Sequence, residues 1–348
     1  MKMTLRWIPQ EGGIPLEHVR QIPCLTGVVS EVVKPVGEVW TPQEIGALKR
    51  RVEAAGLELE VIESVKVHED IKLGLPTRER YIEAYAQTLR NLGRAGVRCV
   101  CYDFMPVFDW MRTQTDKKMA DGSLTLAYSV EQMKALDPLS GSFALCDWEL
   151  GFPPEEIGQY VEGFRALGEE GLWRNLEYFL SKIIPVAQES GVRMAMHPDD
   201  PCWPVFGLPR IIRDEACIDR LLSIVDSPYN ALTLCSGSLG CSDKNDVPAL
   251  VYRYAKRDRV AFGHVRNVKR YADGSFEETS HLAACGSLDT VEIMRAYHEA
   301  NFKGYIRPDH GRTIWGEQCG AGYGLYDRAL GAMYLSGIWD ALEKKAGR

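Results

Sequence analysis

The sequence predicts an α/β protein of the (β/α)₈ class, a TIM barrel. Short β-branched runs alternate with amphipathic segments, and three of the runs follow a helical segment that ends in glycine, in AAGLEL, RAGVRC and ESGVRM. Such alternation with short joins favours a parallel sheet with helices outside it. Eight runs match the strand number of a closed barrel. We expect the strands at 4–8, 27–31, 57–64, 97–104, 192–197, 231–235, 260–264 and 304–308.

The segments between these runs carry helix signals. Thr41 is placed as an N-cap, Pro42 stands at the first helical position and Glu44 follows three residues after the cap, a pattern typical of a capping box. Gly56 marks the end of that helix. The structural alternative to the barrel is an open, doubly wound sheet. We expect helices at 41–55, 77–95, 155–168, 172–190, 289–301 and 326–344.

Residues 105–153, between the fourth and fifth expected strands, break this rhythm. They contain Trp110, Trp148 and several prolines and show little periodicity. Long segments after barrel strands commonly serve the active site. We therefore expect one barrel domain over 1–348, with 105–153 inserted as a large loop over the carboxyl-terminal face.

Composition excludes several classes of protein. The 348 residues are 45% hydrophobic and 26% charged, and the net charge is −7, so no general basic surface for nucleic acid or anionic membrane is expected. The start MKMTLRWIPQEGG lacks the apolar stretch of a secretory signal, and no run approaches the roughly 18 apolar residues of a membrane span. Ten cysteines without such a signal indicate free thiols in the cytoplasm.

Metal-binding side chains stand at the ends of the last four expected strands. MAMHPDDP supplies His197, LTLCSGS supplies Cys235, AFGHVRN supplies His264, and IRPDHGR supplies Asp309 and His310. In a barrel these ends converge on the face that carries active sites. Two imidazoles, a thiolate and a carboxylate mix soft and hard ligands, which suits Zn²⁺, Fe²⁺, Co²⁺ or Mn²⁺ better than Mg²⁺ or Ca²⁺.

Each of these residues alone is commonly structural. A cysteine after an apolar strand is usually buried in the core, and Cys99 and Cys101 are interpreted in that way. The coincidence on four successive strands favours a metal site, but only if the barrel closes, because an open sheet would spread the ends along one edge. Asp199 and Asp200 either orient ligands or cap a helix.

Seven segments taken together resemble the mannonate dehydratase family of hexuronate (glucuronate) catabolism. They are RWIP, IESVKVHEDIKLG, MAMHPDDP, LTLCSGS, GHVRNV, RPDHGR and GYGLYDRALG, in order over essentially the whole chain and without a departure at a motif position. The resemblance implies a xylose-isomerase-like barrel and a hydro-lyase that dehydrates D-mannonate to 2-keto-3-deoxy-D-gluconate with Mn²⁺ or Fe²⁺. It also implies a small sugar acid as the partner molecule, and we expect a homo-oligomer, a dimer or higher.

The resemblance places the metal on the same four strand-end residues and implicates His310 and Tyr323 in the chemistry. An unperturbed histidine has a pKa of about 6.5 and an unperturbed tyrosine about 10. We therefore expect His310 to remove the C2 proton and Tyr323 to assist departure of the C3 hydroxyl, with exchanged roles as an alternative and Tyr326 as the alternative tyrosine.

Further residues near the strand ends are expected to contact substrate, with loop packing as the alternative for Arg6 and Trp7 and surface ion pairing as the expectation for at least one of the arginines. Arg6 and Trp7 end the first strand, and Arg266, Arg307 and Arg312 follow or end later ones; an arginine can hold a carboxylate in a fork. Two other functions remain open on the residues alone. One is a metal-dependent sugar isomerase or epimerase of the same barrel type, and the other is a non-catalytic metal-binding scaffold, against which a spare acid/base pair argues.

Overall fold

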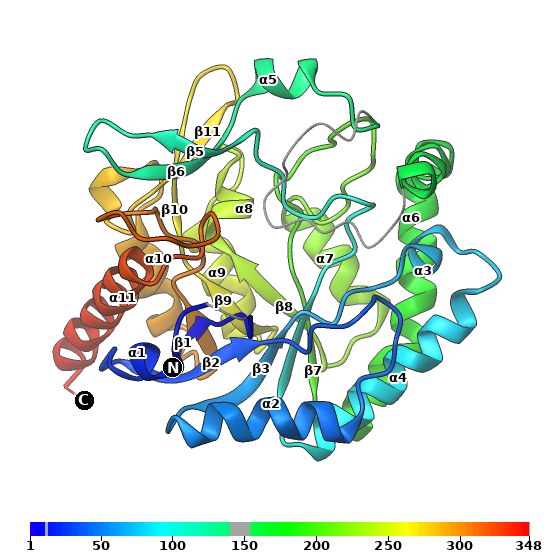
Figure 1. Cartoon of the computed structure of the whole chain (residues 1–348), viewed down its shortest axis with the longest axis horizontal. Coiled ribbons are helices and arrows are strands. Elements are labelled where there is room, and N and C mark those ends of the chain that lie inside the picture. Colours follow the sequence, from blue (N-terminus) through cyan, green and yellow to red (C-terminus); the bar gives the residue numbers. More distant parts are fainter. Residues whose placement is uncertain (11–12, 140–153, 348) are drawn as a thin grey trace.

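The structure is a computed structural model that describes residues 1–10, 13–139 and 154–347, and its centre is a closed barrel of eight parallel strands (Figure 1). Strand β1 pairs with both β2 and β12, so the first and last strands close the barrel. The predicted barrel is confirmed and the open sheet is wrong. Every predicted run agrees with a strand to within two residues: β1 (Lys2–Arg6), β2 (Leu25–Ser30), β3 (Glu58–Glu63), β4 (Cys99–Tyr102), β7 (Arg193–Met196), β8 (Asn230–Cys235), β9 (Val260–His264) and β12 (Tyr305–Arg307).

Helices surround the barrel. The predicted capping box is present, because Thr41 Oγ1 accepts from the Glu44 backbone at 3.3 Å and Glu44 Oε2 accepts from the Thr41 backbone at 2.8 Å. The expected break between two helices falls at Gly168, whose φ of 66° interrupts α6. The helices are α1 (Leu16–Arg20), α2 (Pro42–Ala54), α3 (Glu69–Leu73), α4 (Arg78–Arg94), α5 (Val130–Ala135), α6 (Pro154–Ser190), α7 (Glu215–Ile224), α8 (Ser236–Gly240), α9 (Val247–Lys256), α10 (Thr290–Glu299) and α11 (Tyr326–Lys345), with a 3₁₀ turn at Ala283–Cys285.

The core has two parts. Large apolar side chains such as Trp173 and Phe179 of α6 fill the space between helices and barrel. Inside the barrel most of the side chains are small, and Cys99 and Cys101 belong to this group, as expected. None of the described helices is both long and apolar enough to cross a bilayer.

A second, antiparallel sheet stands beside the carboxyl ends of the barrel strands, with strand order β10-β11-β6-β5 (Figure 1). It joins two distant parts of the chain, since Phe276 of β11 pairs with Tyr128 of β6. The long insertion expected after the fourth barrel strand is present. Its described part, 105–139, is not only a loop, because it contains β5, β6 and α5, and Trp148 lies outside the described residues. The strands are β5 (Gln114–Lys118), β6 (Leu124–Tyr128), β10 (Asn267–Arg270) and β11 (Phe276–Thr279).

Candidate metal centre and active site

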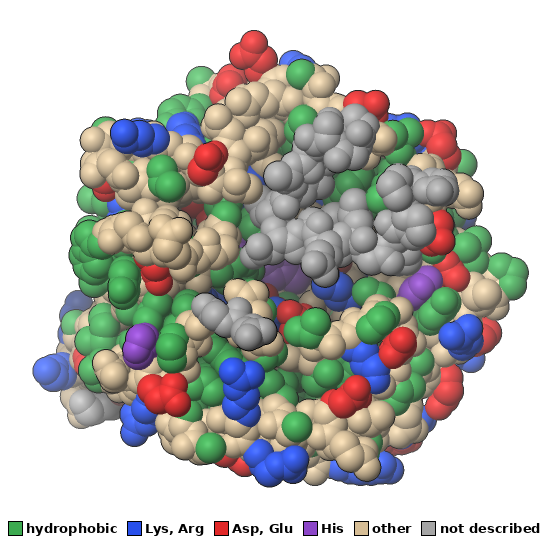
Figure 2. Space-filling model, viewed as in Figure 1, with side chains coloured by type: hydrophobic (Ala, Val, Ile, Leu, Met, Phe, Trp, Pro, Cys, Tyr) green, Lys and Arg blue, Asp and Glu red, His purple; other side chains and the backbone are tan. Residues whose placement is uncertain are grey.

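A cavity of about 1330 Å³ opens at the carboxyl ends of the barrel strands. In Figure 2 acidic, basic and histidine side chains gather around a hollow near the middle of the face shown. Ligand sites in proteins commonly occupy such a place in a barrel. The lining residues that matter below are Arg6, Trp7, Glu63, Cys101, Trp110, His197, Asp200, Arg266, Arg307, Asp309, His310 and Tyr323.

The strand-end residues expected to bind metal come together beside this cavity: His197 and Asp309 line it, and Cys235 and His264 are buried next to them. His197 follows β7, while Cys235 and His264 are the last residues of β8 and β9. One ligand atom from each of these three residues lies within 4.8 Å of those of the other two. Asp309, two residues beyond β12, adds a carboxylate, with Oδ2 3.3 Å from Cys235 Sγ and Oδ1 3.5 Å from His264 Nδ1. The four residues therefore form one compact group of metal-binding type.

Burial sets the protonation of this group. Cys235 and His264 are fully buried. Burial raises the pKa of the Cys235 thiol, and the neighbouring Asp309 carboxylate raises it further. Burial would also raise the pKa of Asp309, but the guanidinium groups of Arg307 and Arg266 outweigh it and hold that pKa well below its usual value. The site thus offers a firm carboxylate and a thiol that a bound cation would convert to thiolate.

A second group of ligand type, made of Glu63, Cys101 and His264, shares one histidine with the first. Arg307 already occupies this second group, because its Nε donates to His264 Nε2 at 3.1 Å and its Nη2 donates to Glu63 Oε1 at 2.8 Å. A guanidinium cation in contact with two of three ligands disfavours a metal cation there. By contrast, His264 Nδ1, which faces Asp309, is buried without a hydrogen-bond partner among the described residues.

The orphaned atoms fit a cation bound at Nδ1. A metal on Nδ1 of a neutral imidazole leaves the ring proton on Nε2. Glu63 Oε2 lies 3.6 Å from His264 Nε2 and is itself buried without a hydrogen-bond partner among the described residues. In this structure Nε2 accepts from Arg307 Nε. A cation at Nδ1 would put a proton on Nε2 in its place, and Glu63 Oε2 would then be the acceptor, the carboxylate–histidine–metal arrangement common in metalloproteins. The first group of ligands is therefore the one that suits a metal.

His310 and Tyr323 lie together at the wall of the same cavity. Their ring centroids are 5.2 Å apart, and the indole of Trp110 packs 4.6 Å from His310 and 6.4 Å from Tyr323. Burial raises the pKa of Tyr323 in spite of the nearby Arg307 guanidinium, so its phenol keeps its proton at neutral pH. Tyr326, the alternative tyrosine, is 43% exposed on α11 and does not line the cavity.

A buried network of ion pairs stands behind His310. His310 Nδ1 lies 3.1 and 3.0 Å from the two carboxylate oxygens of Glu278 on β11. Arg112 donates to Glu278 at 2.6 Å and to Asp200 at 2.8 Å, and Arg266 donates to Asp200 at 2.5 Å. Each of the five side chains is less than 5% exposed. Buried charges are tolerated when they are paired in this way. These ion pairs connect the antiparallel sheet to the wall of the cavity.

The residues expected to bind substrate are placed differently from one another. Arg6 is buried and donates to Glu31 through Nη2, while its Nη1 has no hydrogen-bond partner among the described residues. Trp7 lines the cavity, and its indole nitrogen donates to a backbone carbonyl. Arg266 lines the cavity and is committed to carboxylates of the protein. Arg312 is not among the lining residues and pairs with Asp121 and Asp327 instead.

The last helix reaches back to this site through Arg328. This arginine is 1% exposed and donates to the backbone carbonyls of Arg6, Tyr323 and Gly324 at 2.7, 2.6 and 2.6 Å. It thereby joins the end of β1, the loop that carries Tyr323 and helix α11.

Sequence reasoning overlooked Glu278 and Arg112 as parts of the active site. For the ion-pair network behind His310, the sequence offered one indication, the pair Asp199–Asp200. Asp200 does form ion pairs with two arginines. Glu278 and Arg112 carry no such signal, because their contact joins positions 166 residues apart.

Comparison with known proteins agrees with this geometry. The family model described as "D-mannonate dehydratase (UxuA)" matches residues 1–348. The chain is 51% identical to the mannonate dehydratase of Thermotoga neapolitana over 100% of this chain and 99% of that protein. The solved mannonate dehydratase of Streptococcus suis serotype 2 superposes with a TM-score of 0.94 at 44% identity, covering 100% of this chain and 96% of that one.

More distant structures share only the fold. An L-ribulose 3-epimerase superposes with a TM-score of 0.57 at 13% identity, over 100% of this chain and 97% of that one. This likeness agrees with the expected xylose-isomerase-like barrel. The family model matches the full length of the chain, and about half of all residues are identical to those of a relative over both whole chains. The chain therefore belongs to the D-mannonate dehydratase family.

Proposed function

We propose that this protein dehydrates D-mannonate to 2-keto-3-deoxy-D-gluconate with the help of one divalent cation held by His197, Cys235, His264 and Asp309. The observation that carries the proposal is the convergence of these four side chains beside a cavity that His197, Asp309 and His310 line, with the buried Nδ1 of His264 left without a hydrogen-bond partner in the described structure. A scaffold without catalysis would not need an imidazole and a phenol on the wall of the same cavity.

Mn²⁺ or Fe²⁺ is the proposed cation. The ligand set mixes a soft thiolate with a hard carboxylate and two imidazoles, which such ions of intermediate softness accept. When bound, the cation would polarise the substrate carboxylate and make the neighbouring C2–H bond more acidic.

His310 is the proposed base for the C2 proton. Its ring lines the cavity and packs against the rings of both Trp110 and Tyr323. The C2–H bond breaks as the proton moves to His310, and its electron pair forms the C2=C3 double bond.

Tyr323 is the proposed acid. Burial raises its pKa, so it enters the reaction protonated and can give its proton to the C3 hydroxyl, which leaves as water. The enol then takes a proton from solvent at C3 and becomes the 2-keto acid. The proton held on His310 returns through solvent to Tyr323 and restores both groups.

Arg6, Trp7 and Arg266 are the proposed substrate-binding residues. Arg6 is the best supported of the three, because its buried Nη1 lacks a hydrogen-bond partner in the described structure and its side chain lines the cavity. Arg307 has an equally unpartnered Nη1 and is a further candidate. Arg312 was expected to join them, but its two carboxylate partners leave it a role in holding the loop after β12.

The segment 105–153 is proposed to cover the carboxyl face of a single barrel domain, 1–348. Support comes from its described part, since Met105, Asp109 and Trp110 line the cavity. Within the family's hexuronate (glucuronate) catabolism the protein is proposed to work in the cytoplasm, and the described cysteines, all free thiols, suit a reducing compartment.

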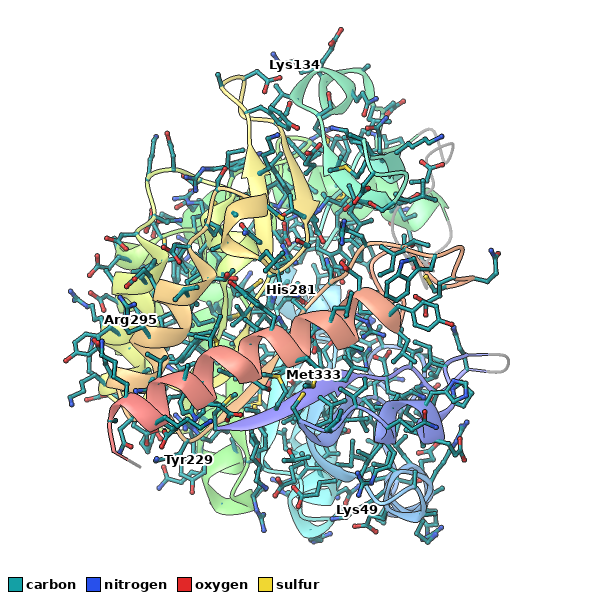
Figure 3. All side chains as sticks on the ribbon, turned by 90° about the vertical axis from the view of Figure 1, so that its left-hand side faces the viewer. Lys49, Lys134, Tyr229, His281, Arg295 and Met333 are labelled. Carbon is teal, nitrogen blue, oxygen red and sulfur yellow. The ribbon has the colours of Figure 1, made fainter. Side chains whose placement is uncertain are left out.

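A homo-oligomer, a dimer or higher, is also proposed. Tyr326, Leu330 and Met333 recur at helical spacing on α11 and are each more than 40% exposed, and Trp315, 75% exposed, packs against Tyr326. Figure 3 shows α11 running across the surface with Met333 on it. Exposed apolar stripes of this kind commonly mark protein contacts.

The test is a keto-acid assay on a panel of aldonates in the presence of Mn²⁺, Fe²⁺ or chelator. D-Mannonate should yield the keto acid only with metal, and in D₂O the product should carry a solvent deuteron at C3. Recovery of an isomerised acid that keeps its water would move the protein to the isomerase class. For the roles, His310→Asn should lose exchange of the C2 hydrogen with solvent, whereas Tyr323→Phe should retain it and lose dehydration.

A further inference from the structure

The partner of His310 comes from outside the barrel. The ligand candidates and His310 itself end or follow barrel strands, whereas Glu278 belongs to β11 of the antiparallel sheet. Its two carboxylate oxygens lie 3.1 and 3.0 Å from His310 Nδ1. These distances lie within the ordinary range of N–H···O hydrogen bonds, about 2.7–3.2 Å, and both residues are only 4% exposed.

Arg112 holds Glu278 in place independently of His310. Arg112 donates to Glu278 Oε1 twice, from Nε at 3.0 Å and from Nη2 at 2.6 Å. Burial alone would raise the pKa of Glu278, but the imidazole of His310 when protonated and the guanidinium groups of Arg266 and Arg112 outweigh it and hold that pKa at about 2. The side chain is therefore a carboxylate at neutral pH and can only accept hydrogen bonds.

An acceptor at this place decides which nitrogen of His310 carries the proton. Facing a carboxylate, Nδ1 must be the protonated nitrogen, and Nε2 of the neutral ring is then free to take a proton. Arg266 Nη1 also lies 3.3 Å from Nδ1, but it donates over a shorter distance, 2.7 Å, to Asp309. Both oxygens of Glu278 lie closer to Nδ1 than this nitrogen does, so the carboxylate is the principal partner of Nδ1.

We propose that Glu278 is the positioning residue of the reaction, holding His310 with a bare Nε2 turned to the substrate. After proton transfer the same carboxylate faces a fully protonated imidazolium and stabilises it, as buried carboxylates behind catalytic histidines do. This inference rests on the proposed role of His310 as the base. It also gives the antiparallel sheet a function, since the sheet delivers the group that orients the base.

The test begins with Glu278→Gln. The amide can turn its NH₂ group toward Nδ1, which favours the tautomer with the proton on Nε2 and leaves no base. We expect kcat to fall about 10²- to 10⁴-fold, with KM and the bound metal per chain close to wild type. Glu277→Gln is the matched control: Glu277 precedes Glu278 on β11, is equally buried and pairs with Lys117. It should keep kcat within about twofold.

A double-mutant cycle with His310→Asn separates positioning from general support of the structure. If Glu278 acts through His310, adding Glu278→Gln to His310→Asn lowers kcat no further. Multiplied losses in the double variant would overturn the proposal, as would wild-type kcat in Glu278→Gln.

If the proposed role of His310 as the base is wrong, a different measurement shows it, the exchange of the C2 hydrogen with solvent. In that case His310→Asn alone would still exchange the C2 hydrogen at the wild-type rate. If Glu278→Gln does not fold, Glu278→Asp enters the same cycle, because it keeps the charge and shortens the reach. We expect Glu278→Asp to lose kcat partially and only when His310 is present, and a loss of equal size in the His310→Asn background would refute the inference.

Discussion

Gly237 lies under the side chain that joins the proposed metal site to the buried network. A Cβ at position 237 would stand 2.0 Å from Arg266 Nε and 2.5 Å from its Cγ. These atoms belong to the stem of a side chain that is 2% exposed, so a small adjustment of its far end cannot relieve the overlap. In Gly237→Ala we therefore expect Arg266 to leave its place between Asp200 and Asp309.

The cost can be estimated from what Arg266 holds. Overpacking costs at least about 1 kcal/mol, and removing one partner from a buried ion pair costs about 3–5 kcal/mol. Asp200 keeps Arg112 and Asp309 keeps Arg307, so the second cost falls at its lower end. We expect a total loss of about 4 kcal/mol in the free energy of unfolding, measured by urea denaturation, together with weaker metal retention.

Gly46→Ala is the control for this experiment. Gly46 lies inside α2, and an added Cβ would meet only Arg50 Nη1, the free end of a flexible side chain, at 3.2 Å. Alanine in a helix interior should raise the free energy of unfolding by about 0.5–1 kcal/mol. If Gly237→Ala instead stays within about 1 kcal/mol of wild type and keeps its metal, Arg266 does not support the site as argued.

Three further outcomes are expected. Cys235→Ser should fold normally but bind Mn²⁺ at least about tenfold more weakly, and equal metal content after dialysis would contradict the ligand assignment. Thr41→Ala should lose about 1 kcal/mol of stability in urea through its capping box, and Thr41→Ser should recover most of it. Because the pKa of Glu278 is held at about 2, below its ordinary 4.5, its carboxylate stabilises the fold above pH 4.5 and loses this effect toward pH 2. The stability difference between wild type and Glu278→Gln should shrink over that range, and a constant difference in acid titrations would argue against the pairing.

The barrel could be predicted because its signals are local. Each strand is a short apolar run, and signals such as Thr41 and Gly56 lie beside the element that they bound. The metal-type residues were found for the same reason, since the end of a strand is visible in the sequence and a closed barrel brings strand ends together. The placement of Tyr323 in the cavity was instead expected from family resemblance.

The antiparallel sheet could not be predicted because its pairing is not local. β5 is QTDKK and β11 is FEET, short and charged segments without an apolar alternation. They become strands only by pairing: β5 pairs with β6, and β11 pairs with β10 and β6. The strands β6 and β11 are far apart in the sequence. Glu278 was missed together with the sheet that carries it, and Arg112, which precedes β5, was missed because its contact is with Glu278.

The pairing of β1 with β12 also has a consequence for protein synthesis. A chain emerging from the ribosome can form its early β/α units as they appear, but the first strand must wait for residue 305 and beyond before its second neighbour exists. Arg328 then has to dock on the carbonyls of Arg6 and Tyr323. The nascent chain accordingly carries open strand edges and an unassembled cavity for almost the whole of translation, and catalysis begins only with the finished molecule.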